Sequence, residues 1–434
     1  MNLEAVCASL RSAAGALAAE NAEKKNAALL SAAAELEAEA AEILEANAGD
    51  VQRARESGMR ESLVARLALS ASGLKEIAAS VRALAAQTDP VGEVTGGWTL
   101  PNGLEIRRVR VPLGVVAVIY ESRPNVTADV FALAYKSANA VLLRGSSSAL
   151  ASNRAIVAAL KRGLQKAGGH PDAVELSEPE AGSHADVDWI LGATGKIDAA
   201  LPRGGAQLIR RVVESARIPV IETGAGVCHI YADASADLQK AVPVIENAKI
   251  QKPGACNALE CLLVHDGIAD KLLPALLPAF ARYADKTGRP GGVELRCCPR
   301  SLAVLQACCG QEGLPPNVVP ASAADWGCEF LDYILAVKTV SSAEEAISHI
   351  NRFGTRHSES VLTGSRETAR RFQREVDAAC VYVNASTRFT DGGQFGMGAE
   401  LGISTQKLHA RGPMGVEALT SIKYLIDGDG QIRP

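Results

Sequence analysis

Residues 115–167 read VVAVIYESRPNVTADVFALAYKSANAVLLRGSSSALASNRAIVAALKRGLQKA, and this stretch decides the predicted fold. The apolar run VVAVIY is followed by an amphipathic segment near 129–137, and the run AVLLRG by a second one near 150–167. Strands that alternate with helices of this length are typical of a parallel sheet of the doubly wound kind. We expect the run IPVIET, residues 218–223, to be the last strand of this part.

A second stretch with the same alternation begins near Asn257. It contains the apolar runs ALECLLVH at 258–265, YILAVKTV at 333–340 and VYVN at 381–384, with a helix near 343–351 before the last of them. The sequence therefore predicts a second α/β domain.

The segments before residue 115 lack this alternation. Apolar residues recur at steps of four and three between Leu29 and Ile43, which predicts a helix that ends at Gly49, and helical character continues to about Gln87. The segment LEIRRVRVP, residues 104–112, alternates apolar and basic side chains. It predicts a strand at an exposed edge or at a contact between subunits.

Composition and charge favour a cytosolic protein that binds small molecules. The 434 residues carry 45 basic and 49 acidic side chains, without the basic excess that nucleic acids or membrane surfaces attract. The N-terminal segment does not resemble a signal peptide, and no stretch approaches the ~18 apolar residues of a membrane helix. A cytosolic location keeps the ten cysteines reduced. The doublets Cys297, Cys298 and Cys308, Cys309 lack C-x2-C spacing, so no metal site is expected.

The segment NAKIQKPGACNALECLLVH, residues 247–265, holds the candidate nucleophile. A Pro-Gly pair forces a turn immediately before Cys256, and an apolar strand follows, so we expect the sulfur on a rigid bend. A free thiol with a pKa near 8.5 is only slightly ionised at neutral pH, and Lys249 or Lys252 would raise the ionised fraction. The alternative is a buried structural cysteine, the usual state of this residue.

The segment AVLLRGSSSALASN, residues 140–153, is a candidate nucleotide site. A strand ends at Arg144 and Gly145, and a serine cluster leads into a helix whose free backbone N–H groups attract phosphate. The G-x-G-x-x-G turn is absent, and no acidic residue follows the strand to hold a ribose hydroxyl. Arg144 and Ser146 stand there instead and suit a 2′-phosphate, which favours NADP over NAD. The alternative is a helix cap beside a solvated arginine.

Two further segments have the composition of binding loops. In LPRGGAQLIRR, residues 201–211, Arg203 and the pair Gly204, Gly205 open a helix, which suits either a pyrophosphate or plain capping. Residues 383–415 are rich in glycine, hydroxyl and charged side chains. Loops of this composition line a site or run over the surface.

Taken together, these segments resemble the gamma-glutamyl phosphate reductases, a family of the aldehyde dehydrogenase superfamily. The matching phrases keep their order along the chain and are VPLGVVAVIYESRPNVTADV, VLLRGSSSA, LPRGGA, IPVIETGAGVCHIYAD, NAKIQKPGACNALE and VNASTRFTDGGQFGMGAELGISTQKLHARGPMGVEAL. The resemblance implies an aldehyde dehydrogenase-like α/β fold with a Rossmann-like cofactor domain, an α/β catalytic domain and a small oligomerisation extension. The expected parts are the NADP-binding domain at 1–102 and 114–225, the catalytic domain at 226–410, and the extension at 103–113 and 411–434.

The resemblance implies NADPH-dependent reduction of L-glutamyl 5-phosphate to L-glutamate 5-semialdehyde with release of phosphate, the second step of proline biosynthesis from glutamate. Cys256 would displace phosphate to form a thioester, which then accepts a hydride. The Cys256 backbone N–H and Asn257 are the expected donors to the oxyanion, joined by Ser122 or Asn125.

The resemblance also assigns binding residues and partners. Arg123 and Arg388 suit the anionic groups of the substrate, because arginine grips an anion with two parallel hydrogen bonds. The expected cofactor contacts are Arg144, Gly145, Ser146, Arg203, Gly204, Gly205 and, at a ribose, Glu329. The expected partners are a small-molecule substrate, further copies of the chain, and glutamate 5-kinase as the separate source of glutamyl phosphate; nucleic acid and membrane are not expected.

Two departures from the family pattern leave alternatives open. Lys252 stands where the family often has arginine, and Glu222 stands where hydrolytic aldehyde dehydrogenases keep the base that activates water. Because Thr223 follows it in place of Leu-Gly-Gly, we interpret Glu222 as structural or cofactor-facing. The alternatives are a hydrolytic aldehyde dehydrogenase, a binding-only relative, and a cofactor-free thiol acyltransferase or hydrolase, for which His229 and His265 carry no triad signature.

Overall fold

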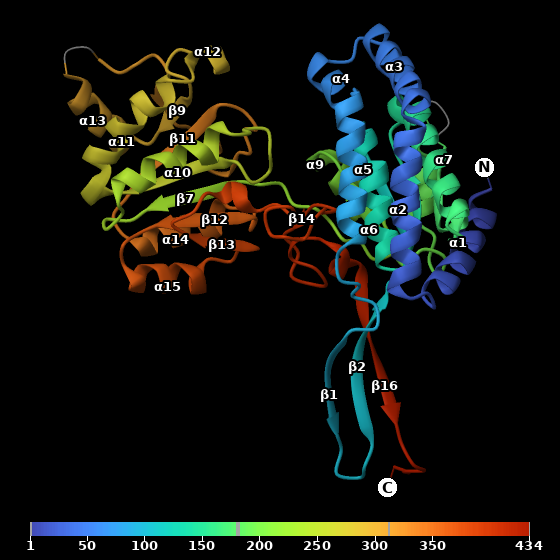
Figure 1. Cartoon of the computed structure of the whole chain (residues 1–434). Helices are drawn as coiled ribbons and strands as arrows, with labels where there is room; N and C mark the ends of the chain where they lie inside the picture. The colour runs from blue at the N-terminus through green and yellow to red at the C-terminus, as the bar shows by residue number, and fades with distance from the viewer. Residues whose placement is uncertain (1, 179–182, 311–312, 434) are drawn as a thin grey trace. The chain divides into compact units, whose positions relative to one another are not determined.

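The computed structural model of the chain describes residues 2–178, 183–310 and 313–433, which form two compact units (Figure 1). Unit 1 comprises Met1–Thr223, Gly392–Gly402 and Leu408–Pro434, and unit 2 comprises Gly224–Asp391 and Ile403–Lys407. Within the described residues, no helix combines the length and the apolar character that crossing a membrane requires.

Unit 1 combines a layer of helices with a parallel sheet and a separate antiparallel sheet. Its helices are α1 (Leu3–Leu17), α2 (Ala22–Ala38), α3 (Ala40–Glu56), α4 (Glu61–Leu67), α5 (Ala71–Ala85), α6 (Pro124–Lys136), α7 (Leu150–Lys166), α8 (Ala185–Leu191), α9 (Ala206–Ser215), and the 3₁₀ helices η1 (Ser147–Ala149), η2 (Pro171–Ala173) and η6 (Val416–Leu419). Its strands are β1 (Val94–Thr99), β2 (Glu105–Pro112), β3 (Val115–Tyr120), β4 (Ala140–Arg144), β5 (Val174–Leu176), β6 (Ala199–Arg203), β15 (Gly412–Pro413) and β16 (Thr420–Asp427).

The parallel sheet of unit 1 has the order β5-β4-β3-β6. β3 and β4 are buried along their whole length, as expected of parallel strands that helices cover. Helices α2, α5, α6 and α7 lie side by side (Figure 1) and share one apolar core with this sheet. The predicted strand and helix alternation of residues 115–167 is confirmed.

The predicted helix end at Gly49 is wrong. Gly49 lies inside α3, which continues to Glu56 and stops before Gly58, whose φ of 76° is left-handed. A glycine inside a helix costs only ~1 kcal/mol, which the packing of α3 against α7 offsets. The preceding helices begin at asparagine caps, since Asn2 and Asn21 accept hydrogen bonds from the first backbone N–H groups of α1 and α2.

The three-stranded sheet of unit 1 is antiparallel and has the order β1-β2-β16. It projects from the helical part of the unit and ends near the C-terminus (Figure 1). The strand predicted at 104–112 is confirmed as β2, but of its two predicted settings, an exposed edge or a contact between subunits, the edge is wrong. β2 is the middle strand, because β1 pairs with one side and β16 with the other.

Unit 2 is built around a seven-stranded sheet. Its strands are β7 (Cys228–Ala232), β8 (Leu259–His265), β9 (Glu294–Cys297), β10 (Val318–Pro320), β11 (Ile334–Val340), β12 (Ser358–Leu362), β13 (Cys380–Val383) and, outside that sheet, β14 (Ile403–Ser404). Its helices are α10 (Leu238–Ile250), α11 (Asp266–Ala281), α12 (Ala284–Thr287), α13 (Pro299–Cys309), α14 (Ala343–Phe353), α15 (Arg366–Glu375), η4 (Ala323–Gly327) and η5 (Thr387–Phe389).

The seven strands run parallel in the order β10-β9-β11-β8-β7-β12-β13. Helices α10, α11 and α13 share an apolar cluster with one face, and α14 and α15 share another cluster with strands of this sheet. The predicted second α/β region is therefore confirmed. Because the strands are parallel, their amino ends meet at one edge of the sheet.

Two elements of unit 1 differ from their predictions because of proline residues. Residues 218–223 form no strand and contribute an isolated bridge between Val220 and Ala200, since Pro219 has no N–H to extend a ladder. The helix predicted near 129–137 begins earlier, at Pro124, because the fixed φ of proline suits the first helical position.

Candidate active site

Cys256 lies in a bend at the amino edge of the unit 2 sheet, between α10 and β8. Two successive turns form this bend, because Ala255 N–H donates to the Lys252 carbonyl at 3.1 Å and Ala258 N–H to the Ala255 carbonyl at 2.9 Å. The side chain is partly exposed, as a nucleophile requires, and the strand that follows is buried. The predicted rigid bend before a strand is confirmed.

The backbone of Gly226 passes directly beside the Cys256 peptide. A Cβ built on Gly226 would overlap the carbonyl oxygen of Cys256, so only glycine allows this approach. The Gly226 N–H donates to Glu329 Oε1 at 2.6 Å. Glu329 is half-buried, and burial raises the pKa of its carboxyl group. Glu329 therefore contacts Gly226, the residue whose backbone packs against the Cys256 peptide.

Cys228, the first residue of β7, holds the Cys256 peptide through its thiol. Its S–H donates to the Cys256 carbonyl at 3.2 Å, and its sulfur lies 3.8 Å from His357 Nδ1. Burial raises the pKa of Cys228 well above the usual range, which keeps this thiol protonated. Cys228 is thus a donor that positions Cys256. Sequence reasoning missed it, because no local pattern relates Cys228 to Cys256.

Asn257 ties the nucleophile bend to the loop at 387–390. Its side-chain Nδ2 donates to the carbonyls of Thr390 at 2.8 Å and Arg388 at 3.4 Å, and Thr387 Oγ1 donates to the Asn257 carbonyl at 2.7 Å. The residue is 4% exposed. Its amide is therefore engaged with the loop that carries Arg388.

Arg388 lies close enough to Cys256 for their charges to interact. Its Nε donates to Gln251 Oε1 at 2.7 Å. Burial lowers the pKa of Arg388, and a negative charge on Cys256 would raise it, which means that the guanidinium and a thiolate at Cys256 stabilise each other. The structure thus brings Cys256, Asn257 and Arg388 together within unit 2.

The predicted role of Lys249 beside the thiol is wrong. Its Nζ is fully buried and lies 2.6 Å from Glu260 Oε2, and it also donates to the Leu259 carbonyl at 2.8 Å. A fully buried lysine that is committed to a carboxylate and a carbonyl supports the sheet and has its charge balanced there. Lys252 is exposed on the bend itself.

The remaining predicted residues lie in unit 1, at the carboxyl edge of its parallel sheet. Arg144 and Arg203 are the last residues of β4 and β6, and the segment 121–125 follows β3 between them. Nucleotides bind at this edge of doubly wound sheets. The edge therefore collects the predicted cofactor residues of unit 1, while Glu329 belongs to unit 2.

A cluster of serine hydroxyls lies at this edge. Ser148 Oγ lies 2.6 Å from Ser122 Oγ and 2.9 Å from Ser146 Oγ, and the Ser148 N–H donates to Ser146 Oγ at 3.3 Å. The structure thus brings the predicted Ser122 and Ser146 together through Ser148. Ser148 was not among the predicted site residues, and its position in the run RGSSSA was the sequence signal that could have identified it.

Arg144 is held by a carboxylate that sequence reasoning missed. Its Nε and Nη2 lie 2.8 and 3.2 Å from the two carboxylate oxygens of Asp186, and its Nη1 lies 3.5 Å from the Gly145 carbonyl. Burial acts to raise the pKa of Asp186, but the hydrogen bond and charge of Arg144, together with hydrogen bonds from Val187 and Ser177, lower it overall. Arg144 is therefore buried and paired with Asp186, which excludes the alternative of a solvated arginine beside a helix cap.

The glycine pair before α9 binds an acidic side chain. The Gly205 N–H donates to Glu121 Oε1 at 2.9 Å, and a Cβ on Gly204 would lie 2.6 Å from the Glu121 carboxyl carbon. The carboxylate oxygen stands in for an oxygen of a phosphate, because both are anionic acceptors for a helix N-terminus. The segment thus has the geometry of an anion site, and a phosphate would have to displace Glu121.

Asn125 and Arg123 begin α6. Asn125 Nδ2 donates to Asp129 Oδ2 at 3.4 Å, and the Arg123 N–H donates to the Glu121 carbonyl at 2.7 Å. Burial raises the pKa of Asp129 to about 6, although Arg203, Asn125 and Ser80 each act to lower it. Keeping the Asp129 carboxylate charged at neutral pH therefore lowers the free energy of unfolding.

We expect Asp129→Asn to stabilise the protein at neutral pH. The folded-state pKa of about 6 lies above the ordinary value of 3.8, so the native state binds the proton more tightly and stability falls as pH rises between these values. Removing the charge should add about 1–2 kcal/mol above pH 6, after discounting for the partial exposure of the side chain. Melting temperatures at pH 5 and pH 7.5 check this. The gain should shrink at the lower pH, and Asp172→Asn, at an exposed position, should show no such pattern.

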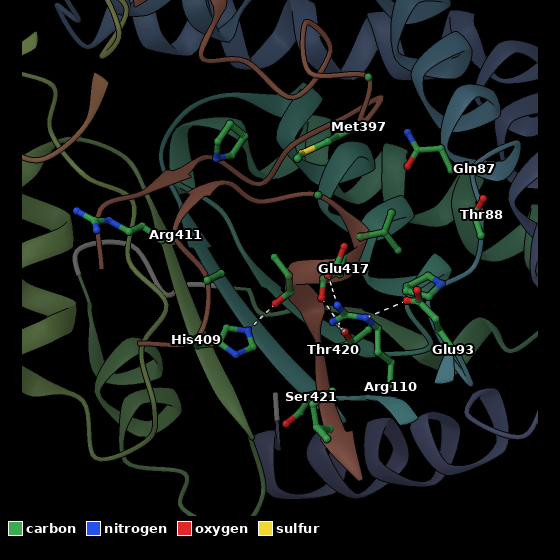
Figure 2. Close-up of a pocket in the computed structure, with 18 of the residues that line it drawn as sticks. Gln87, Thr88, Glu93, Arg110, Met397, His409, Arg411, Glu417, Thr420 and Ser421 are labelled. Atoms are coloured by element: carbon green, nitrogen blue, oxygen red, sulfur yellow. Dashed lines mark hydrogen bonds and ion pairs between the residues drawn. The ribbon is translucent and has the colours of Figure 1, made fainter. Parts of the chain in front are cut away.

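Unit 1 has a cavity of about 890 Å³, and none of its described lining residues is a predicted site residue. Figure 2 shows side chains that line it. The cavity lies where the three-stranded sheet meets the segments 86–90 and 409–418. Arg110 lines it, with its Nε 3.0 Å from Glu93 and its Nη2 bonded to Glu417. The cavity thus presents a neutralised arginine and no cysteine among its described lining residues.

Comparison with known proteins identifies relatives along the whole chain. The model of the aldehyde dehydrogenase family matches residues 1–294 and 328–424. Gamma-glutamyl phosphate reductase of Treponema pallidum is 56% identical over 429 residues, 99% of each chain, and that of Moorella thermoacetica is 51% identical over 423 residues, 98% of this chain and 96% of the relative. The crystal structure of gamma-glutamyl phosphate reductase from Thermotoga maritima matches with a TM-score of 0.93 and 45% identity, covering 100% of both chains.

Proposed function

The chain belongs to the aldehyde dehydrogenase family, and within it to the gamma-glutamyl phosphate reductases, and from this premise we propose that it reduces L-glutamyl 5-phosphate to L-glutamate 5-semialdehyde through a thioester on Cys256. The chain is an oxidoreductase with an aldehyde dehydrogenase-like α/β fold, and its family uses a nicotinamide cofactor. The product of this reaction belongs to proline biosynthesis.

The observation that carries the proposal is the way unit 2 holds Cys256. The Gly226 backbone and the Cys228 thiol fix its peptide, and the charge of Arg388 reaches its sulfur. A positive charge close to a thiol favours the thiolate, which is the form that attacks a carbonyl carbon. Cys228 keeps its proton, so the two neighbouring cysteines have different roles.

The reaction proceeds through two transfers at the sulfur of Cys256. The thiolate attacks C5 of glutamyl phosphate, the carbon–sulfur bond forms, and phosphate leaves with the electron pair of the carbon–oxygen bond. The nicotinamide, when bound, supplies a hydride to the thioester carbon. The oxyanion that results then re-forms the carbonyl, the carbon–sulfur bond breaks, and the electron pair returns to sulfur as the aldehyde leaves.

We assign the oxyanion contact to the backbone N–H of Cys256. We do not assign this contact to Asn257, because its amide nitrogen donates to the carbonyls of Arg388 and Thr390. Its role in our proposal is therefore to hold the loop at 387–390 in place. Ser122 and Asn125 of unit 1 are the proposed further donors, since both can offer a hydrogen bond to a developing negative charge.

Two arginines are proposed to bind the anionic groups of the substrate. Arg388 stands beside the nucleophile and suits the phosphate that leaves, because a guanidinium donates two parallel hydrogen bonds to phosphate oxygens. Arg123, at the start of α6, is proposed for the carboxylate.

The carboxyl edge of the unit 1 sheet fits a dinucleotide, and we propose NADPH. The hydroxyls of Ser122, Ser146 and Ser148 and the anion-binding N–H of Gly205 are donors of the kind that phosphates need. Arg144 supplies a positive charge at the end of β4, which suits a 2′-phosphate. Gly145, Arg203 and Gly204 complete the proposed cofactor contacts in unit 1, and Glu329 is the proposed ribose contact.

Removing the charged pair of Arg144 and Asp186 tests the preference for NADPH. We expect Arg144→Met combined with Asp186→Asn to weaken NADPH binding by about tenfold or more and NADH binding much less, because only NADPH loses a charge-assisted bond. The double change avoids an unpaired buried carboxylate. Fluorescence titration of the free enzyme measures both constants. Asp186→Asn alone is the control, and equal weakening of both cofactors would contradict the assignment.

The requirement for phosphate in the reverse reaction tests the proposed activity. Pyrroline-5-carboxylate, which is in equilibrium with the semialdehyde, is incubated with NADP⁺, with and without phosphate. We expect NADPH to form only when phosphate is present, because phosphate must displace the acyl group from Cys256. A hydrolytic aldehyde dehydrogenase, with Glu222 as the base for water, would form NADPH without phosphate, and that result would reject the proposal.

The proposed setting is a cytoplasmic homo-oligomer. The three-stranded sheet carries exposed apolar side chains, among them Val94, Trp98, Tyr424 and Ile426, which a further copy of the chain would cover. None of the ten cysteines, all of which lie among the described residues, forms a disulfide bond, which agrees with a reducing compartment. Glutamate 5-kinase is the proposed source of the acyl phosphate.

A further inference from the structure

A row of polar side chains crosses three neighbouring strands inside unit 2. Glu359 of β12, His229 of β7 and Cys261 of β8 stand directly opposite one another in register. All three are at most 1% exposed. Because side chains alternate along a strand, they share one face with Tyr231, Leu263 and Val361, which belong to an apolar cluster. Burying such a row in apolar surroundings is costly unless its members find partners.

His349 of α14 closes over this row. Its Nε2 lies 3.8 Å from Cys261 Sγ, and its ring packs against the ring of His229 with centroids 5.6 Å apart. One donor atom from each of His229, Cys261 and His349 lies within 4.8 Å of the other two. Two strands and a helix thus bring two imidazoles and a thiol to one point.

The sulfur–nitrogen separation in this cluster is close to that of two ligands around a zinc ion. With Zn–S near 2.3 Å and Zn–N near 2.05 Å, tetrahedral angles place a sulfur and a nitrogen ligand about 3.6 Å apart. The observed distance between Cys261 Sγ and His349 Nε2 is 3.8 Å. Cys261 and His349 therefore already lie close to the spacing that a shared zinc ion requires.

The atoms around the cluster include one nitrogen without a partner and a carboxylate that orients it. His229 Nε2 is buried and makes no hydrogen bond, whereas its Nδ1 lies 3.1 Å from Glu359 Oε2. An imidazole whose Nδ1–H donates to a carboxylate directs the lone pair of Nε2 to the opposite side, and carboxylates support metal-binding histidines in this way. Here the opposite side contains Cys261 and His349.

We propose that His229, Cys261 and His349 bind a zinc ion, with Glu359 as the carboxylate that orients His229. The two positive charges of the ion balance the Cys261 thiolate and the Glu359 carboxylate, so the buried group becomes neutral. A monovalent ion would leave one negative charge. The ion would join β7, β8 and α14, which is a structural role and independent of the reaction at Cys256.

A contact from Lys338 opposes the ion and supplies a test. Lys338 Nζ lies 3.5 Å from His349 Nδ1 and 3.2 Å from Glu345. A lysine that donates to Nδ1 favours the tautomer with a proton on Nε2, which cannot bind metal. Zinc binding therefore requires Lys338 to turn to Glu345, and replacing Lys338 should make binding tighter.

Metal titration of the full chain tests the proposal. After dialysis against a chelator, Zn²⁺ is added in competition with a chromophoric chelator, and Co²⁺ is added separately to detect the charge-transfer absorption of a cobalt–thiolate bond. We expect one tight site per chain, a loss of affinity of at least ~100-fold in Cys261→Ser and in His349→Gln, and a loss of ~10- to 100-fold in Glu359→Gln. Lys338→Gln should bind zinc more tightly than the unaltered chain.

Two cysteine variants are matched controls. Cys297→Ser removes another buried thiol of the same sheet, and Cys256→Ser removes the reactive thiol. Both should keep the site and the cobalt–thiolate absorption. Circular dichroism identifies any variant that fails to fold, and His349→Gln then replaces Cys261→Ser as the deciding case. No tight site in the unaltered chain, or a site lost in Cys256→Ser and kept in Cys261→Ser, overturns the proposal.

Discussion

Cys256→Ala should lower kcat/KM for glutamyl phosphate by roughly 10⁴-fold or more, because no other group can form the thioester that accepts the hydride. The fold should survive, since the hydrogen bond from Cys228 and the close approach of Gly226 are to the main chain of residue 256, which the substitution keeps. The partly exposed sulfur also leaves no buried cavity. Activity is followed as NADPH oxidation with freshly made substrate, and NADPH binding by fluorescence.

The control for this variant is Cys308→Ala, which removes an exposed thiol that we assign no role. It should keep full activity. Cys256→Ala should still bind NADPH with an affinity close to that of the unaltered chain, because the proposed cofactor contacts do not include the sulfur. Semialdehyde production at the normal rate by Cys256→Ala would disprove the thioester route, and joint loss of cofactor binding and thermal stability would mean that the substitution disturbs the fold.

The α/β character of both units was predictable because it depends on local patterns. The run at 115–120 and the run at 259–265 are apolar enough to indicate buried strands without any tertiary information. The short strands at 294–297 and 318–320 have too few residues to show an alternation of apolar and polar side chains. The strand at 228–232 begins with Cys228 and His229, so it does not stand out as an apolar run. Those strands owe their place to pairing with neighbours, which no local pattern records.

The candidate site was predictable only as far as it is local. The turn before Cys256 is determined by the neighbouring Pro253 and Gly254, so the bend and the strand after it could be predicted from the sequence. The contacts that hold the bend come from far along the chain, as with Glu329 on Gly226 and Thr390 on Asn257. Asp186, which pairs with Arg144, is likewise 42 residues away. Such contacts form only when strands and loops meet in the fold.

Gly226→Ala should nearly abolish activity although it leaves every proposed reacting group in place. The added methyl group would overlap the Cys256 carbonyl oxygen, so one of the two backbone segments must move. A displacement of ~1 Å at a nucleophile can cost on the order of 10²-fold in rate. Overpacking of this kind also lowers the free energy of unfolding by roughly 1–3 kcal/mol. The kcat, the rate of alkylation of Cys256 and the melting temperature measure these effects.

Gly254→Ala is the matched control, since it adds the same methyl group two residues before the nucleophile. There the nearest atom to the new Cβ is the Leu331 carbonyl oxygen at 3.9 Å, an ordinary contact. If glycine matters at 226 because of the close approach, Gly254→Ala should keep most of the activity while Gly226→Ala loses it. Equal losses would indicate that the flexibility of the bend matters more than the approach of the two backbones. Normal kinetics in Gly226→Ala would show that the Cys256 peptide need not be held there for the sulfur to react.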